Sequence, residues 1–183
     1  MSARTPRHAG ERIVYDGRVV KVALADVELP GGSGIELEIL RHPGAAAIVP
    51  FSGPEEVLLI RQYRFAADGF LWEIPAGKLE ADERPESCAA RELEEETGRR
   101  AGRLEALGSI LTTPGFTDEV IHLFAAYDLE ASQQRLEPDE LIEVVPTSFD
   151  EALDMVFDGR IRDGKSALGL LHAAHRAGRL GRV

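Results

Sequence analysis

The sequence predicts an α+β protein built on a mainly antiparallel sheet, and three observations support this. Short runs rich in Val, Ile and Leu alternate with Gly and Pro turn signals over residues 12–64 and again over residues 103–148. One helical pattern, residues 85–97, separates these two regions, and two more follow at residues 149–157 and 165–176. The last of these is expected to bury Leu168, Leu170, Leu171 and Ala174. The chain has 183 residues, which suffices for one well-packed domain with a small appendage.

Composition and charge restrict the possible classes of function. The net charge of −11 argues against a general nucleic-acid binder, because such a protein presents a basic surface to phosphate. The single cysteine, Cys88, excludes an intramolecular disulfide, and we expect it to serve packing only. The N-terminus lacks the apolar segment of a secretory signal, and no apolar run approaches the roughly 20 residues that span a bilayer. We therefore expect a cytoplasmic protein that does not associate with membranes.

The first 43 residues are predicted to form a small β unit of their own. Residues 1–10 are polar and are expected to fray. Residues 12–41 have the pattern of about three antiparallel strands separated by glycine-containing turns. Because so small a unit is marginally stable alone, it must pack on the main domain, residues 44–183, or on a second subunit. A homodimer is therefore expected.

An apolar run in the main domain, VLLIRQYR, ends in the two arginines Arg61 and Arg64. Two arginines at a strand end are consistent with simple solvation. They are equally consistent with an anion contact, because a guanidinium group matches phosphate oxygens with two hydrogen bonds. The pattern alone leaves both interpretations open.

The most acidic stretch is GKLEADERPESCAARELEEETGR, residues 77–99. Its helix has an apolar arc of about 100° that is expected to face the core, formed by Ala89, Ala90 and Leu93. A neighbouring arc is acidic and is formed by Glu92, Glu95 and Glu96, whereas Glu94 is expected to point into solvent. Like charges at this spacing destabilise a metal-free helix, and hard oxygen ligands suit Mg²⁺ or Mn²⁺. The alternative is a solvated acidic helix face.

The backbone just before this helix offers one more oxygen ligand. Pro75 and Gly77 keep the segment between them out of helix and sheet, so the carbonyl of Ala76 is expected to be free to bind a cation.

The acidic stretch resembles the Nudix box, G-x5-E-x7-R-E-U-x-E-E-x-G-U, in which U is a bulky apolar residue. The residues that match at the required spacing are Gly77, Glu83, Arg91, Glu92, Leu93, Glu95, Glu96 and Gly98. The final apolar position is occupied by Arg99, which affects local packing rather than catalysis. The resemblance implies a Nudix fold for residues 44–183: an α/β/α sandwich of the α+β class with a mixed, largely antiparallel sheet.

The flanking sequence resembles one branch of this family, the ADP-ribose pyrophosphatases. The shared segments are the N-terminal β unit, HPGA, RQYR, LWEIPAGK, PGFTDE and IRDGKS. Pro114 occupies the position past the box that marks this branch. The resemblance implies hydrolysis of ADP-ribose to AMP and ribose 5-phosphate with two or three Mg²⁺ ions, or Mn²⁺ in their place. It also implies that the N-terminal unit serves dimerisation and substrate contact.

The resemblance further assigns roles within the box. Glu92 and Glu96 bind the divalent cations directly, together with the carbonyl of Ala76, and Glu95 supports them. Arg91 pairs with Glu83 to brace the helix. The residues implied in substrate binding lie outside the box and are Arg41, Arg64, Glu73, Pro114 and Glu119.

The catalytic base of this branch comes from a late acidic loop, which is LEPDELIE here. Glu140 falls where the family places a base or an additional metal-binding glutamate. Some members carry a second glutamate two positions earlier, where this chain has Pro138 with Glu137 beside it. The base therefore stays open between Glu140 and Glu137, with Glu140 favoured.

Two alternative functions remain. One is hydrolysis of another sugar nucleotide, such as GDP-mannose or ADP-glucose, on the same scaffold. The other is a module that senses ADP-ribose without turnover, against which the complete set of box carboxylates argues.

Overall fold

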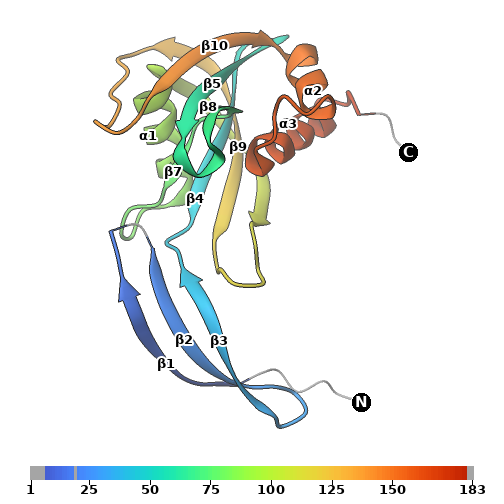
Figure 1. Cartoon of the computed structure of the whole chain (residues 1–183). Coiled ribbons are helices and arrows are strands. Elements are labelled where there is room, and N and C mark those ends of the chain that lie inside the picture. Colours follow the sequence, from blue (N-terminus) through green and yellow to red (C-terminus); the bar gives the residue numbers. More distant parts are fainter. Residues whose placement is uncertain (1–6, 19, 181–183) are drawn as a thin grey trace. The chain divides into compact units, whose positions relative to one another are not determined.

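The computed structural model describes residues 7–18 and 20–180 and divides the chain into two compact units (Figure 1). The first unit comprises Met1–Gly44 and Leu111–Val120, and the second comprises Ala45–Ile110 and Ile121–Val183. The loop at residues 111–120 thus groups with the N-terminal segment, which the sequence pattern did not indicate.

The first unit contains a three-stranded antiparallel sheet in the order β1-β2-β3. Its strands are β1 (Arg7–Asp16), β2 (Lys21–Glu28) and β3 (Gly34–Arg41). One face is apolar, because Ala23 pairs with Ile13 and Ile39 on the neighbouring strands. The three predicted strands are confirmed. The expected fraying is wrong for residues 7–10, which pair with β2, and residues 1–6 lie outside the described residues.

The second unit contains a seven-stranded mixed sheet. Five strands form the path β10-β5-β4-β9-β8, while β6 pairs with β5 and β7 pairs with β4. β4 runs parallel to β9 and antiparallel to β5 and β7. The strands are β4 (Ala45–Gly53), β5 (Glu56–Arg64), β6 (Gly69–Glu73), β7 (Ala76–Lys78), β8 (Arg99–Leu111), β9 (Val120–Ala131) and β10 (Ile142–Ser148). The expectation that the segment between Pro75 and Gly77 stays out of the sheet is wrong, because Ala76 pairs with Ala47 of β4.

Helices cover both faces of this sheet, which gives the three layers seen in Figure 1. They are α1 (Pro85–Thr97), α2 (Phe149–Phe157) and α3 (Gly164–Arg176), with a short 3₁₀ turn, η1, at Phe65–Ala67. On β4, Ala47 and Val49 pack in the cluster with α2 and α3, whereas Ala46 and Ile48 pack with α1. Since both faces of β4 are buried, its sequence is continuously apolar. The predicted mixed, largely antiparallel fold is confirmed.

The helix boundaries agree with the sequence, but two predicted core residues do not. Pro85 opens α1, and Gly98, at φ 65°, caps it in the left-handed conformation. Ala90 is exposed, because the buried stripe of α1 runs through Cys88, Ala89, Glu92, Leu93, Glu96 and Thr97. Leu168 of α3 is 40% exposed, because that helix buries Ser166, Gly169, Leu170, Ala173 and Ala174 instead. No helix within the described residues is long and apolar enough to cross a membrane.

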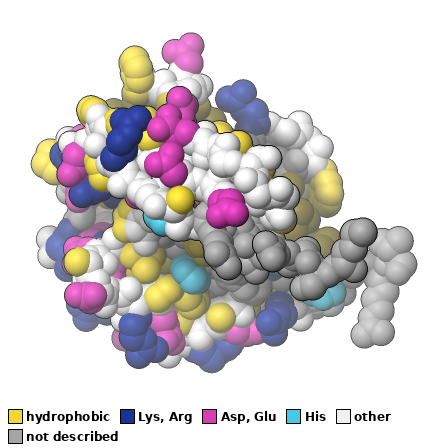
Figure 2. All heavy atoms as spheres, turned by 90° about the horizontal axis from the view of Figure 1, so that it is seen from below, with side chains coloured by type: hydrophobic (Ala, Val, Ile, Leu, Met, Phe, Trp, Pro, Cys, Tyr) yellow, Lys and Arg dark blue, Asp and Glu magenta, His cyan; other side chains and the backbone are white. Residues whose placement is uncertain are grey.

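The space-filling view shows how charge is distributed on one face of the molecule. On the face drawn in Figure 2, Lys and Arg side chains are interspersed with Asp and Glu side chains and with hydrophobic ones. This mixture differs from the continuous basic stripe with which nucleic-acid-binding proteins contact phosphate.

Candidate active site

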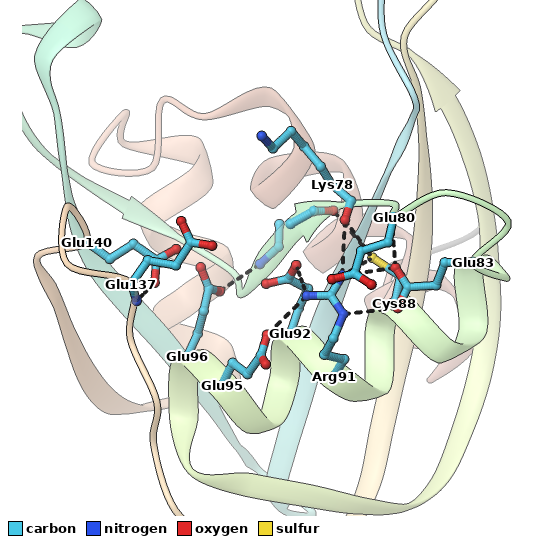
Figure 3. Close-up of polar contacts among 12 residues, drawn as sticks. Lys78, Glu80, Glu83, Cys88, Arg91, Glu92, Glu95, Glu96, Glu137 and Glu140 are labelled. Carbon is cyan, nitrogen blue, oxygen red and sulfur yellow. Dashed lines mark hydrogen bonds and ion pairs between the residues drawn. The ribbon is translucent and has the colours of Figure 1, made fainter. Parts of the chain in front are cut away.

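A cleft of about 410 Å³ in the second unit is lined by four of the acidic residues singled out above, Glu92, Glu95, Glu137 and Glu140. It lies between α1, the turn after β7 and the loop that precedes β10 (Figure 3). The residues that line it are Gly77, Lys78, Leu79, Glu80, Arg91, Glu92, Glu95, Arg135, Glu137 and Glu140.

Arg91 donates hydrogen bonds to three carboxylates on α1 and on the loop before it. Its Nε and Nη2 donate to the two oxygens of Glu83 at 3.0 and 2.9 Å, so the expected ion pair is present. Its Nη1 donates to Glu92 at 2.6 Å and to Glu95 at 3.0 Å. Hydrogen bonding to Arg91 lowers the pKa of Glu83 to about 2. One guanidinium group therefore ties the loop before α1 to the acidic face of the helix.

Glu96 is the most deeply buried carboxylate of the box, with 2% of the residue exposed. Burial raises its pKa to about 8, against a hydrogen bond of 2.8 Å that the Ala76 N–H donates to its Oε2. The nearby charges of Glu92 and Glu140 add to this rise. Burial also raises the pKa of Glu92, which Arg91 opposes. Three carboxylates therefore converge in a poorly solvated place, where a cation would relieve their repulsion.

The absence of a side chain at Gly77 leaves room for the Glu92 carboxylate. A Cβ atom at position 77 would lie 1.9 Å from Oε1 of Glu92, so only glycine fits while that side chain keeps its position. Among residues 7–18 and 20–180, no three His, Cys, Asp or Glu side chains are already drawn together as a metal cluster. Arg91 donates a hydrogen bond to Glu92 and the Ala76 N–H donates one to Glu96, and the hard oxygen atoms of these carboxylates fit Mg²⁺ or Mn²⁺.

The loop before β10 is docked on the C-terminal end of α1. Ser132 donates through its hydroxyl to Glu94 at 2.7 Å, and the Arg135 N–H donates to the Glu95 carbonyl at 2.8 Å. Glu94 also accepts from Arg100 at 2.8 Å, which lowers its pKa to about 2. The prediction that Glu94 points freely into solvent is therefore wrong, since the loop covers it.

The two candidate bases lie on this loop, on the side of Glu96 away from Arg91 (Figure 3). The Glu137 N–H donates to Oε2 of Glu140 at 2.8 Å, which fixes the Glu140 carboxylate. Glu140 is half-buried and its charge acts on Glu92 and Glu96, whereas Glu137 is exposed. This geometry favours Glu140 as the residue that works with the box.

Arg64 and Glu73 form a second charged group of the same unit. Arg64 donates through Nε and Nη2 to the two oxygens of Glu73, each at 2.8 Å. Glu73 is also bonded by Lys165, a residue to which the sequence assigned no role. The only sequence signal for Lys165 was its place in IRDGKS, and its contact with Glu73 depends on how α3 packs.

Three predicted substrate-binding residues, Arg41, Pro114 and Glu119, belong to the first unit. Arg41 donates to Glu11 and, at 2.8 Å, to Asp118, so it fastens the loop at residues 111–120 to β3. Glu119 lies 3.4 Å from His42 Nδ1 and accepts from Thr112, and Pro114 is in the exposed turn of the loop.

Cys88 is fully buried beneath the box, as predicted. Its Sγ lies near the carbonyls of Gly77 and Lys78. Burial, with the charge of Glu92, raises its pKa to about 12, so the thiol stays neutral and packs α1 against the sheet.

The fold and the box together define the class of protein, and comparison with known proteins names it. The sequence profile of the NUDIX domain matches residues 40–166, and this chain belongs to the Nudix family. A solved structure described as an ADP compounds hydrolase superposes with a TM-score of 0.85 at 22% identity. That match covers 98% of this chain and 100% of the other, and it supports the fold.

Several curated proteins are similar to this chain in sequence over most of their length. The chain is 42% identical over 159 residues to the methanol dehydrogenase activator of Bacillus methanolicus. It is 38% identical over 159 residues to the ADP-ribose pyrophosphatase of Bacillus subtilis (strain 168), and each of these matches covers 86% of both proteins. It is also 39% identical over 137 residues to the GDP-mannose pyrophosphatase of Klebsiella pneumoniae, covering 70% of this chain and 69% of that protein.

Proposed function

We propose that this protein is a divalent-cation-dependent hydrolase that cleaves the diphosphate of ADP-ribose to AMP and ribose 5-phosphate. The observation that carries the proposal is the convergence of Glu92, Glu96 and Glu140 beside a cleft in a Nudix domain. The ADP-ribose pyrophosphatase of Bacillus subtilis, at 38% identity, supports the choice of substrate.

Glu92, Glu96 and the carbonyl of Ala76 are the proposed ligands of two or three Mg²⁺ or Mn²⁺ ions. Bound metal supplies charge neutralisation for the diphosphate and lowers the pKa of a water molecule. Glu95 supports the ligands from the exposed side of α1. Arg91, through its bonds to Glu83 and Glu92, fixes the position of α1 relative to the loop that precedes it.

Glu140 is the proposed general base that accepts the proton of the attacking water. Its carboxylate is fixed by the Glu137 N–H and faces the same carboxylates that are the proposed metal ligands. Glu137 is the alternative base, but its side chain is exposed. Arg64 is the proposed phosphate contact and stabilises the charge that develops on the phosphate oxygens.

The first unit is proposed to serve dimerisation and to supply Arg41, Pro114 and Glu119 for substrate binding. Its sheet carries an apolar face with Ile13 48% exposed and Leu37 37% exposed, which a second copy of the chain would cover. We propose a cytoplasmic homodimer. A mass in solution equal to a single chain would contradict the dimer.

The test is incubation with ADP-ribose, ADP-glucose, GDP-mannose and NADH in the presence of Mg²⁺, with identification of the products. AMP and ribose 5-phosphate formed fastest from ADP-ribose support the proposal. Preferential cleavage of GDP-mannose favours the second candidate, which the GDP-mannose pyrophosphatase of Klebsiella pneumoniae supports. Binding without product from any of the four compounds would indicate a sensing module instead.

A further inference from the structure

Four alternating charges connect the start of α3 to the end of β5. Nζ of Lys165 contacts Oδ2 of Asp163 at 3.0 Å and also the Oε2 atom of Glu73. Glu73 in turn accepts both hydrogen bonds of the Arg64 fork, at 2.8 Å each. The carboxylates of Asp163 and Glu73 therefore alternate in space with the cations of Lys165 and Arg64. Arg64, at the end of the row, is the residue proposed to contact the diphosphate.

The middle of this chain of charges is buried and its end is open. Glu73 is 1% exposed, the Lys165 side chain is 13% exposed and the Arg64 side chain is 40% exposed. A buried carboxylate is costly unless cations and hydrogen bonds compensate it. Burial acts to raise the pKa of Glu73, but bonds from Arg64 and Lys165 hold it below its ordinary value. Glu73 is thus an anchor for two cations and is itself shielded from solvent.

The position of Lys165 is set by tight packing at the start of α3. The Ser166 hydroxyl accepts from the Ile74 N–H at 2.8 Å, and the Ser166 N–H donates to Asp163 at 3.0 Å. A Cβ atom on Gly169 would lie 2.8 Å from Cδ1 of Ile74, so the helix lies directly against the segment that follows Glu73. The packing of the start of α3 therefore fixes the position of Lys165 relative to Glu73.

The charges decide what Lys165 contributes. Two carboxylates and two cations balance, so Arg64 shares the neutralisation of Glu73 with a second cation. Without Lys165, Arg64 would be the only cation of the group beside two carboxylates, and its attraction for an anion would fall. Arg64 bonds Glu73 through Nε and Nη2, so Nη1 is not used in this pair and could donate to another acceptor.

We propose that Lys165 is a positioning residue that acts through the buried Glu73. It keeps Arg64 fixed, with its charge available to the diphosphate of the substrate. This inference rests on the proposed function for the identity of the substrate. Lys165 itself need not touch the substrate, and Glu73 contributes to substrate binding through Arg64.

The test compares Lys165→Met, Lys165→Arg, Arg64→Met and the double variant Arg64→Met/Lys165→Met in the full-length protein. Arg160→Met is the control, because it removes a surface cation that pairs with Asp158 and Glu151. For each variant, kcat and KM for ADP-ribose are measured with Mg²⁺, together with the Kd for ADP and the Tm. ADP presents a diphosphate without requiring turnover.

We expect Lys165→Met to raise KM and the Kd for ADP about 10- to 100-fold with a smaller change in kcat, because a misplaced phosphate contact loses binding. Lys165→Arg should recover most of the loss. In the Arg64→Met background, Lys165→Met should change either constant less than about threefold, since residues that act as one unit are not additive.

The inference would be overturned if Lys165→Met behaved like Arg160→Met, or if its effect added in full to that of Arg64→Met. A drop in Tm and kcat with KM and Kd unchanged would mean that Lys165 is only structural, and would also overturn it. Failure of the wild-type protein to cleave any nucleoside diphosphate sugar defeats the proposed function instead. In that event the ADP titrations still decide whether Lys165 acts through Arg64.

Discussion

Replacing Glu96 by Gln should stabilise the metal-free protein, and more so as the pH rises. Gln keeps an oxygen that can accept the Ala76 N–H bond but cannot ionise. The pKa of Glu96 is raised from 4.5 to about 8, chiefly by burial, with the charges of Glu92 and Glu140 adding to it and that of Lys165 opposing it. A raised carboxyl pKa means that the folded state resists ionisation, so folding costs more wherever the unfolded chain is ionised.

The size of the effect follows from the same pKa. The loss in free energy of unfolding that Glu96 causes is absent below about pH 4.5, grows as the pH rises, and is complete above about pH 8. At about 1.4 kcal/mol per pKa unit, the upper bound is on the order of 5 kcal/mol. This is a large share of the roughly 5–15 kcal/mol that stabilises a typical domain. The wild-type protein without metal should therefore become markedly less stable between pH 5 and 8.

Urea unfolding in EDTA at pH 5, 6.5 and 8 measures this difference. Glu86→Gln is the control, because Glu86 lies on the same helix but is exposed and pairs with Arg84 at the surface. We expect Glu96→Gln to raise the free energy of unfolding by an amount that increases with pH. Glu86→Gln should change the free energy of unfolding by no more than about 1 kcal/mol at each pH. A Glu96→Gln difference that does not change with pH, or a loss of stability at pH 8, would refute the reasoning.

Three further results are expected. Glu140→Gln should lower kcat by about 10²-fold or more while Glu137→Gln changes it little, and the reverse result would move the base to Glu137. Gly77→Ala should fold yet lose metal-dependent activity, because the added Cβ displaces the Glu92 carboxylate, and full activity would contradict this. Light scattering should give the mass of a dimer, whereas a mass of 20.0 kDa would contradict the proposed assembly.

Local features of the molecule could be predicted because the sequence carries them directly. Pro85 and Gly98 mark both ends of α1, and the resemblance to the Nudix box implied the pair that Arg91 forms with Glu83. The continuous apolar run of β4 is typical of a buried strand, and in the structure α1 packs on one face of it and α2 and α3 on the other.

Features that depend on distant segments could not be predicted. Helical periodicity places Glu94 away from the core, but only the docked loop with Ser132 shows that it is covered. Lys165 meets Glu73 because α3 packs against the segment after β6, and no local pattern signals that contact. Likewise, Asp118 joins its loop to β3 through Arg41, a pairing of residues far apart in the sequence.

The central claim is that buried carboxylates of the box hold the cations for hydrolysis of a nucleoside diphosphate sugar. The most direct measurement is the turnover of ADP-ribose at saturating Mg²⁺ by the wild-type protein and by Glu96→Gln. We expect the wild type to release AMP and ribose 5-phosphate and the variant to be slower by roughly 10³-fold or more. Near wild-type turnover by Glu96→Gln at saturating Mg²⁺ would contradict the claim.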